Sequence, residues 1–253
     1  MTEQMDEKKG EINPEERAKE GLKSLFNEGL MIDIFQADES ISLYKMIGLN
    51  AEGINKYNFG ELFGALQGVL SDRLVLSLNK LFEVEKKNPS RSIPSVLTYL
   101  EKNAFILKIN SKSKLISGLN ELGGDGDFSE NDPLPDSEFS KILVSRLRQF
   151  IPHHKGDTKL SKTLIALRES RDKRIAHNEH IESTRIAGVT WNECIELLDF
   201  AKKFTATIGF GYLSLMMQWP SGEYILSDDA ERRSVALKRL FKKAGIIDEH
   251  QNI

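Results

Sequence analysis

Apolar residues recur at three- and four-residue intervals along almost the whole chain, and the two-residue alternation typical of strands is nearly absent. This spacing predicts amphipathic helices with one buried face. The expected helices span residues 15–36, 38–49, 58–85, 93–108, 112–122, 137–151, 158–178, 190–217 and 228–243. We therefore predict an all-α fold, an antiparallel bundle of long helices with N-terminal and C-terminal helical extensions.

Polar side chains stand where several of these helices should begin. Ser92, Ser111 and Asp157 occupy expected N-cap positions, where a side-chain oxygen accepts a free backbone N–H of the first turn. Asn58 and Thr190 each precede a glutamate by three residues, which is the spacing of a capping box. These signals predict helix starts directly after the five residues.

Three glycines, Gly60, Gly64 and Gly68, recur every four residues in the predicted helix 58–85. Each costs about 1 kcal/mol relative to alanine in a helix. A ridge of small residues kept at this cost indicates very close helix packing, either within the chain or across a dimer.

The chain has 253 residues, enough to bury a full core without disulfide bonds or metals. Its single cysteine, Cys194, excludes a disulfide framework, is expected in the core, and suits a cytoplasmic protein. The apolar stretch 204–219 is too short and too often interrupted by polar residues to span a membrane. We expect a charged, flexible N-terminus at 1–16, a helical domain at 17–219 with an acidic loop at 123–136, and a C-terminal amphipathic helix and tail at 220–253.

Charge is distributed unevenly, although the formal net charge is only -3. Residues 121–138 carry seven acids and no base, whereas residues 139–180 carry ten bases and four acids. Four of the five histidines fall in the basic segment. A globally basic nucleic-acid-binding surface is excluded, but a local basic patch for phosphates is not.

An arginine interrupts the apolar face of the predicted helix 158–178. Leucines at 160, 164 and 167 and the isoleucine at 175 share one face, and Arg171 stands between them. An arginine on a packed face needs a partner or a function. The structural alternative is an arginine that snorkels to solvent or forms a salt bridge.

The residues from 171 to 179 read Arg-Asp-Lys-Arg-Ile-Ala-His-Asn-Glu. This segment resembles the Arg-x(4–6)-His motif of HEPN domains (higher eukaryotes and prokaryotes nucleotide-binding), in which a polar residue such as Asp172 follows the arginine. The residue pattern Arg-Asp-Lys-x-x-Ala-His is most similar to that of the abortive-infection U branch of bacterial phage-defence proteins. The resemblance extends over roughly residues 20–217 of an all-helical chain.

The resemblance implies a metal-independent endoribonuclease with no cofactor. The 2′-hydroxyl of RNA attacks the adjacent phosphate, and a 2′,3′-cyclic phosphate is formed. Arg171 and His177 are the implied catalytic residues, and Asp172 orients one of them. Such roles suit these side chains, because histidine exchanges protons near neutral pH and arginine offers several donors to phosphate oxygens. The alternative for His177 is a helix-end histidine stabilised by the carbonyl dipole.

The neighbouring residues Lys173, Arg174 and Asn178 are the expected contacts to RNA. Arg174 and His180 also have motif spacing, but no aspartate follows Arg174, and we prefer the first pair. Six residues separate Arg171 from His177, so a regular helix places them about 120° apart. Either the helix ends near His177 or a second chain completes the site, as the composite dimer sites of the family imply.

Metal sites receive weaker support. Asp125 and Asp127 have the first spacing of a calcium loop but lack its turn glycine, and His153 and His154 have no second pair of ligands. We expect no metal at either place.

The leading hypothesis is a homodimeric HEPN endoribonuclease of phage defence or a toxin, with RNA as substrate and no membrane association. The alternative is a non-enzymatic helical module that binds RNA, nucleotide or a protein in the same Arg/His cleft. A purely structural helical protein does not explain Arg171. The sequence leaves open whether an antitoxin or other regulatory partner exists.

Overall fold

The computed structural model describes residues 13–84, 90–124, 134–172, 189–219 and 221–247. These residues form helices and no strand, which confirms the all-α prediction. The helical elements are α1 (Pro14–Leu25), the π-helical turn η1 (Phe26–Leu30), α2 (Met31–Leu49), α3 (Ala51–Lys56), α4 (Gly60–Leu81), α5 (Ile93–Lys102), α6 (Lys112–Glu121), α7 (Asp136–Phe150), α8 (Lys159–Ser170), α9 (Trp191–Leu213) and α10 (Ile225–Lys243).

The first rod of the fold runs without a break from α1 through η1 into α2, where we had expected separate helices at 15–36 and 38–49. The buried residues Ala18, Leu22, Phe26, Leu30 and Ile34 lie four positions apart. Four residues turn a regular α-helix by about 400°, so each step drifts about 40° around the axis. The wider π turn takes up part of this drift and keeps the apolar face toward the core.

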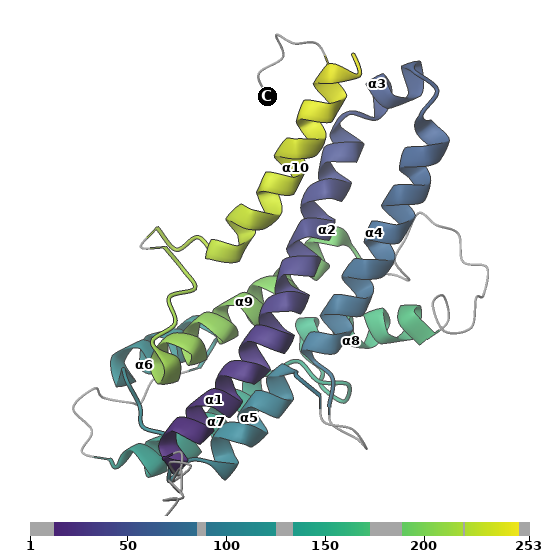
Figure 1. Ribbon diagram of the computed structural model, residues 1–253. Coiled ribbons are helices and arrows are strands. Elements are labelled where there is room, and N and C mark those ends of the chain that lie inside the picture. The colour runs from purple at the N-terminus through teal and green to yellow at the C-terminus, as the bar shows by residue number, and fades with distance from the viewer. Residues whose placement is uncertain (1–12, 85–89, 125–133, 173–188, 220, 248–253) are drawn as a thin grey trace, which may run out of the picture.

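Most helices pack into one part of the molecule, which we call the body. It contains α1, α5, α6, α7, α8, α9 and the adjoining halves of α2 and α4 (Figure 1). Helix α9 is central and contacts α1, α2, α4, α6 and α8. It approaches α6 closely because Gly118 faces Thr207 and Gly211 faces Leu115, with no room for larger side chains.

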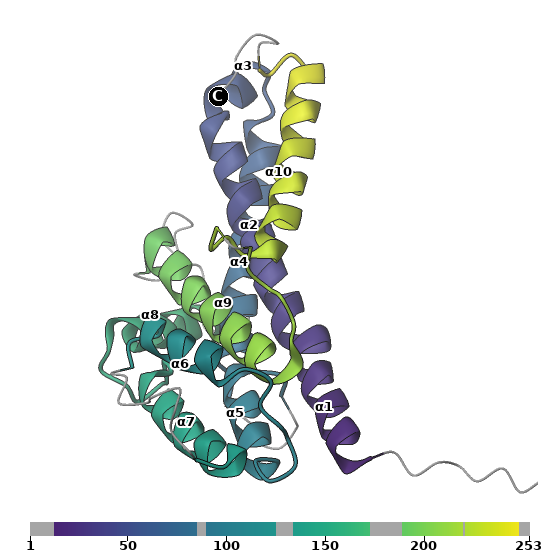
Figure 2. The same ribbon diagram turned by 90° about the vertical axis from the view of Figure 1, so that its left-hand side faces the viewer.

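A second part, which we call the arm, projects from the body and consists of residues 42–70 together with α10 (Figure 2). Its core is small and contains only buried Ile47, Ile54, Phe63, Phe241 and Ile247. The rings of Phe63 and Phe241 meet edge to face, with their centroids 5.2 Å apart. A few side chains therefore hold the last helix, α10, against residues 42–70.

Ion pairs fasten α10 where the arm meets the body. The Lys202 ammonium of α9 lies 2.7 Å from the Asp38 carboxylate of α2, and the Ser227 hydroxyl donates to the second Asp38 oxygen. The next residue of α2, Glu39, pairs with Arg233 of α10 and with Arg73 of α4. Buried carboxylates need such partners, and here they tie four helices together.

The N-cap predictions were right at Ser92, Ser111 and Thr190, and Thr190 forms the complete capping box with Glu193. Two were wrong. Thr158, not Asp157, caps α8, because its hydroxyl accepts the Ser161 N–H while Asp157 pairs with Lys162. Asn58 takes a left-handed conformation (φ 60°) in the turn before α4 and caps nothing.

Several helix ends also differ from the prediction. Helix α5 stops at 102 rather than 108, α9 stops at 213 rather than 217, and α10 begins at 225 rather than 228. Ser214 ends α9 by adopting a left-handed conformation (φ 54°). This end was hard to predict, because the residue is neither a glycine nor a proline. The short helix α3 was not expected at all.

Candidate functional site

Helix α8 carries the start of the predicted motif, and it packs across the body half of α4 and against α9 (Figure 1). Leu164 and Leu167 are buried in this contact, as their spacing predicts. The helix begins at its Thr158 cap and brings Arg171 to its C-terminal end. The buried face of α8 thus ends just before Arg171, the first residue of the predicted motif.

Arg171 itself is not buried with the leucines. Its side chain keeps 28% of its surface exposed and forms an ion pair with the next residue, Asp172, whose side chain is half exposed. The Nε and Nη2 atoms both donate to Asp172 Oδ1, at 2.8 and 2.7 Å. The other three guanidinium N–H donors make no bond to the described residues, and N–H donors of this kind suit oxyanions.

A buried asparagine of α4 holds the turn that precedes Arg171. The Leu167 carbonyl accepts the backbone N–H of Arg171, and it also accepts the Asn79 side-chain amide at 3.3 Å. The same amide donates to the Val75 carbonyl at 2.8 Å. Both amide hydrogens are therefore used, and one of them joins α4 to the end of α8.

The next residue of α4, Lys80, pairs with a buried acid of α2. The Lys80 ammonium lies 3.8 Å from the Asp33 carboxylate, which is almost entirely buried. Burial raises the pKa of Asp33 to about 6, and the nearby Lys80 opposes this rise only in part. A buried acid with a raised pKa thus lies at the junction of α2 and α4.

Sequence reasoning missed both Asn79 and Asp33. Their only sequence signal is a polar residue at a position that the apolar spacing assigns to a buried face. Their partners lie 88 and 47 residues away, and no short motif records such contacts.

Four residues of the predicted site, His177, Lys173, Arg174 and Asn178, lie outside the described residues, as does His180. The same holds for Asp125 and Asp127 of the acidic loop. Where the described chain resumes after that loop, Leu134 and Asp136 are fixed by Lys112, whose ammonium donates to the Leu134 carbonyl at 2.7 Å.

The remaining candidates have no catalytic surroundings. His153 and His154 are exposed, and the described ranges contain no group of three His, Cys, Asp or Glu side chains that could hold a metal ion. Cys194 is buried in the core as predicted, and burial raises the pKa of its thiol to about 12. A thiol so reluctant to ionise is a poor nucleophile.

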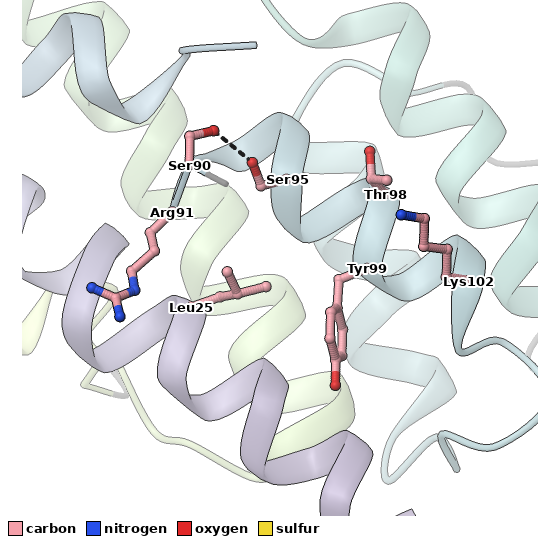
Figure 3. Close-up of a pocket in the computed structure, with 7 residues that line it drawn as sticks. All are labelled: Leu25, Ser90, Arg91, Ser95, Thr98, Tyr99 and Lys102. Atoms are coloured by element: carbon pink, nitrogen blue, oxygen red, sulfur yellow. Dashed lines mark hydrogen bonds between the residues drawn. The ribbon is translucent and has the colours of Figure 1, made fainter. Parts of the chain in front are cut away.

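A cavity of about 460 Å³ lies between the end of α1 and α5, lined by Leu25, Ser90, Arg91, Ser95, Thr98, Tyr99 and Lys102 (Figure 3). Its polar groups are mostly engaged. The Ser90 and Ser95 hydroxyls bond each other at 2.8 Å, and Arg91 pairs with Glu28 at 2.6 Å. None of these lining residues belongs to α8, so the cavity is separate from the Arg171 region.

Comparison with known proteins gives one match. The family model HEPN_AbiU2, described as AbiU2, matches residues 19–232. No curated protein and no solved structure matches this chain. Across the part of the chain that the structure describes, no helix is both long and apolar enough to cross a membrane. With an all-helical fold and a match over most of its length, the chain belongs to the AbiU2 family, the abortive-infection U branch of the HEPN proteins.

Proposed function

We propose that this protein is a metal-independent endoribonuclease that acts in phage defence or as a toxin. The observation that carries the proposal is the ion pair between Arg171 and Asp172 at the C-terminal end of α8, which leaves three of the five Arg171 N–H donors without a bond to the described residues. His177 follows six residues later in the sequence. The family membership supports an HEPN role for these residues.

In the proposed reaction, the 2′-oxygen of RNA attacks the neighbouring phosphorus and loses its proton to a base. The bond from phosphorus to the 5′-oxygen breaks, and that oxygen takes a proton as it leaves. His177 is the group that exchanges protons, and Arg171 stabilises the added charge on the phosphorane oxygens. Asp172 is a positioning residue that limits the rotamers of Arg171.

The RNA footprint should be narrower than the basic segment suggests. Within 139–180, Arg148 pairs with Glu101, Lys159 with Glu196, and Lys162 with Asp157. Glu101 and Glu196 lie outside this segment, so they neutralise two bases that a charge count of the segment treats as free. The proposed contacts to RNA therefore remain Lys173, Arg174 and Asn178, and the affinity for RNA should fall as salt rises.

The proposed active form is a homodimer with a composite site, in which helix 158–178 and a neighbouring helix meet their copies. A stable interface of this kind buries more than about 1,000 Å² in total. An antitoxin or regulatory partner would act on this assembly.

The test is cleavage of total RNA by the purified protein in EDTA. We expect wild-type protein to cut RNA and leave 2′,3′-cyclic phosphate ends, and His177→Ala and Arg171→Ala to lose this activity while keeping their helical content. Arg168→Ala is the matched control, because Arg168 lies one turn earlier on α8 and outside the motif.

Retained cleavage in His177→Ala contradicts the proposal. Binding of RNA in EDTA without cleavage, abolished by Arg171→Ala, supports the non-enzymatic binding module instead. Loss of folding in Arg171→Ala indicates a structural ion pair rather than a reactive site.

A further inference from the structure

The outward face of α10 carries bases without acids. From residue 232 to residue 247 the chain has six lysines and arginines and no aspartate or glutamate. Arg232, Arg239 and Lys243 are exposed and are spaced at i, i+7 and i+11. A regular helix places them within about 40° of one another, in a line about 16 Å long. We call these three residues the α10 row. The family model matches only as far as residue 232, so most of the row lies beyond it.

The charges of the row are not balanced along α10. Arg239 and Lys243 have no acid three or four residues away on the helix, and neither forms an ion pair with a described residue. They are four residues apart, and like charges at this spacing destabilise a helix. Arg232 pairs with Asp229 at 3.1 Å, but both side chains are exposed, and such a pair is weak. An anionic partner would relieve the repulsion within the row.

The apolar side of α10 is already covered by the fold. Phe241 and Ala230 are fully buried, and the Phe241 ring contacts Phe63. On the outward side, Val235 and Leu240 are exposed. A lipid surface binds a helix by taking up a continuous apolar face together with its basic residues. Two separated side chains do not form such a face, so the row does not fit a membrane.

A protein partner fits the row poorly as well. A regular helix places Val235 about 60° to one side of the row and Leu240 about 80° to the other. The cations thus occupy the centre of the surface, and the apolar side chains lie at its edges. Protein interfaces have the reverse arrangement, with an apolar centre and a polar rim.

The α10 row suits the backbone of a nucleic acid. Interfaces with nucleic acids are more polar and more positive than those between proteins. A line of cations can follow a chain of phosphates. Phe241 is the one aromatic residue of α10, and because it is buried the row offers no platform for stacked bases. The expected contact is therefore to phosphates and independent of base sequence.

The row and the predicted motif lie on separate sides of the molecule. Helix α10 packs against α2, whereas α8 packs against α4 and α9. In both Figure 1 and Figure 2, α10 and α8 lie on opposite sides of α2. A short oligonucleotide can therefore occupy only one of the two places at a time. A long strand held at the row has a raised local concentration at the motif.

We propose that the α10 row binds the phosphate backbone of single-stranded RNA, and that the substrate is a strand long enough to reach from α10 to the motif. The length of the substrate rests on the proposed function, whereas the binding of RNA to the row does not require cleavage. Lys243 also lies in the last turn of α10, where a cation stabilises the helix dipole. Arg239 lies one turn earlier, so the test changes both residues.

The test is the affinity for a fluorescent single-stranded RNA of about 30 nucleotides, measured by anisotropy in EDTA over a range of salt concentrations. The RNA is 2′-O-methylated, so its 2′-oxygens cannot attack the phosphates. The variant is Arg239→Gln with Lys243→Gln. The matched control is Lys23→Gln with Lys102→Gln. These two lysines are also exposed and lie in the last turns of α1 and α5, at the other end of the molecule (Figure 2).

We expect the wild-type protein to bind this RNA and the α10 variant to lose part of the salt dependence. Each phosphate contact to a single strand contributes about 0.7 to the slope of log K against log salt, so the slope should become about 1.4 shallower. At about 0.1 M salt this corresponds to roughly 25-fold weaker binding. The control should keep the wild-type slope and affinity. Circular dichroism checks that each variant is folded.

Three results overturn the proposal. The first is a wild-type protein that does not bind the RNA, and the second is an α10 variant with unchanged affinity and slope. The third is an equal loss in the control, which indicates a response to net charge alone. Polyglutamate and phosphatidylserine vesicles test the other occupants. Tighter binding of either than of RNA, lost in the α10 variant, also overturns the assignment to RNA.

Cleavage of unmethylated RNA separates this proposal from the proposed function. The α10 variant should cut the long strand with a raised KM and an unchanged kcat, and should cut a strand of about 8 nucleotides as the wild type does. Equal losses on both strands contradict the long substrate. Row-dependent binding by a protein that cuts no RNA supports the row and contradicts the endoribonuclease, so the two proposals fail separately.

Discussion

Helix α4 belongs to two environments. Its C-terminal half lies in the body, where Leu74, Leu78 and Leu81 are fully buried and even Asn79 has both amide hydrogens bonded. Its N-terminal half lies in the arm, where it buries Phe63 and leaves Leu62, Leu66 and Val69 exposed. The same helix thus packs into the core at its C-terminal end and leaves apolar side chains exposed at its N-terminal end. A helix longer than the core beneath it leaves its excess apolar residues exposed.

The comparison predicts the largest difference for aromatic residues of the two cores. Phe204→Ala in the body should lower the free energy of unfolding by up to about 5 kcal/mol, because tightly packed neighbours cannot fill the cavity. Phe63→Ala in the arm should cost about 3 kcal/mol or less, because the open arm can collapse around the gap. Urea unfolding measures both.

Hydrogen exchange of the wild-type protein gives the same comparison without a variant. Amides of α3 and α10 should exchange by local opening, before those of α9. If the two alanine variants lost the same free energy of unfolding, and amides of the arm and body were equally protected from exchange, the arm would unfold as cooperatively as the body.

The second prediction concerns the buried acid at the body end of α2. The pKa of Asp33 is raised from 3.8 to about 6, so the folded state binds its proton more tightly than the unfolded state does. Its contribution to stability is therefore present below about pH 4 and is lost as pH rises through 6. Two pKa units correspond to about 3 kcal/mol.

Asp33→Asn removes this titration. The stability of the variant relative to wild type should rise by about 2 kcal/mol between pH 4 and pH 7, measured by urea unfolding at each pH. Parallel stability profiles for the two proteins would contradict the raised pKa. Lys80 stays largely exposed, so losing its partner should cost little.

The smallest effect is expected at the contact between α4 and α8. Asn79→Ala removes the bond to the Leu167 carbonyl and should lower the free energy of unfolding by about 1–2 kcal/mol. Amide exchange should accelerate at residues 167–172 and remain unchanged in the arm. If Arg171 acts on RNA, cleavage should fall more in kcat than in KM, because its position rather than its charge is disturbed. Unchanged exchange at 167–172 would show that α8 does not need this bond.

Local interactions explain what the sequence could predict. The caps at Ser92, Ser111 and Thr190 depend on contacts within three residues, and each was visible as a short pattern. The helical class follows from apolar spacing alone. The Arg171–Asp172 pair joins adjacent residues of the contiguous motif, whereas the predicted helix ran to 178 and α8 ends at Ser170.

Contacts between distant segments explain what the sequence could not predict. The amide of Asn79 and the carboxyl of Asp33 acquire their roles from other helices. The apparent charge of +6 in residues 139–180 also shrinks, because Glu101 and Glu196 approach from outside that segment. Position 171 was expected on a packed face, yet the packed face ends one turn earlier and Arg171 is half-buried.

The π turn at Phe26–Leu30 fixes the rotational phase between the two ends of the first rod. Its Met31 N–H bonds the Phe26 carbonyl, five residues back, so the turn holds one residue more than an α turn. If the same residues were wound as a regular α-helix, α2 would rotate by about 100° relative to α1, because the wider turn would no longer take up the extra residue. Asp38 and Glu39 would then turn away from Lys202, Arg73 and Arg233. When members of this family are aligned, a one-residue gap within 26–30 would thus mark a protein with a regular α-helix here and nearly the same orientation of α2 relative to α1.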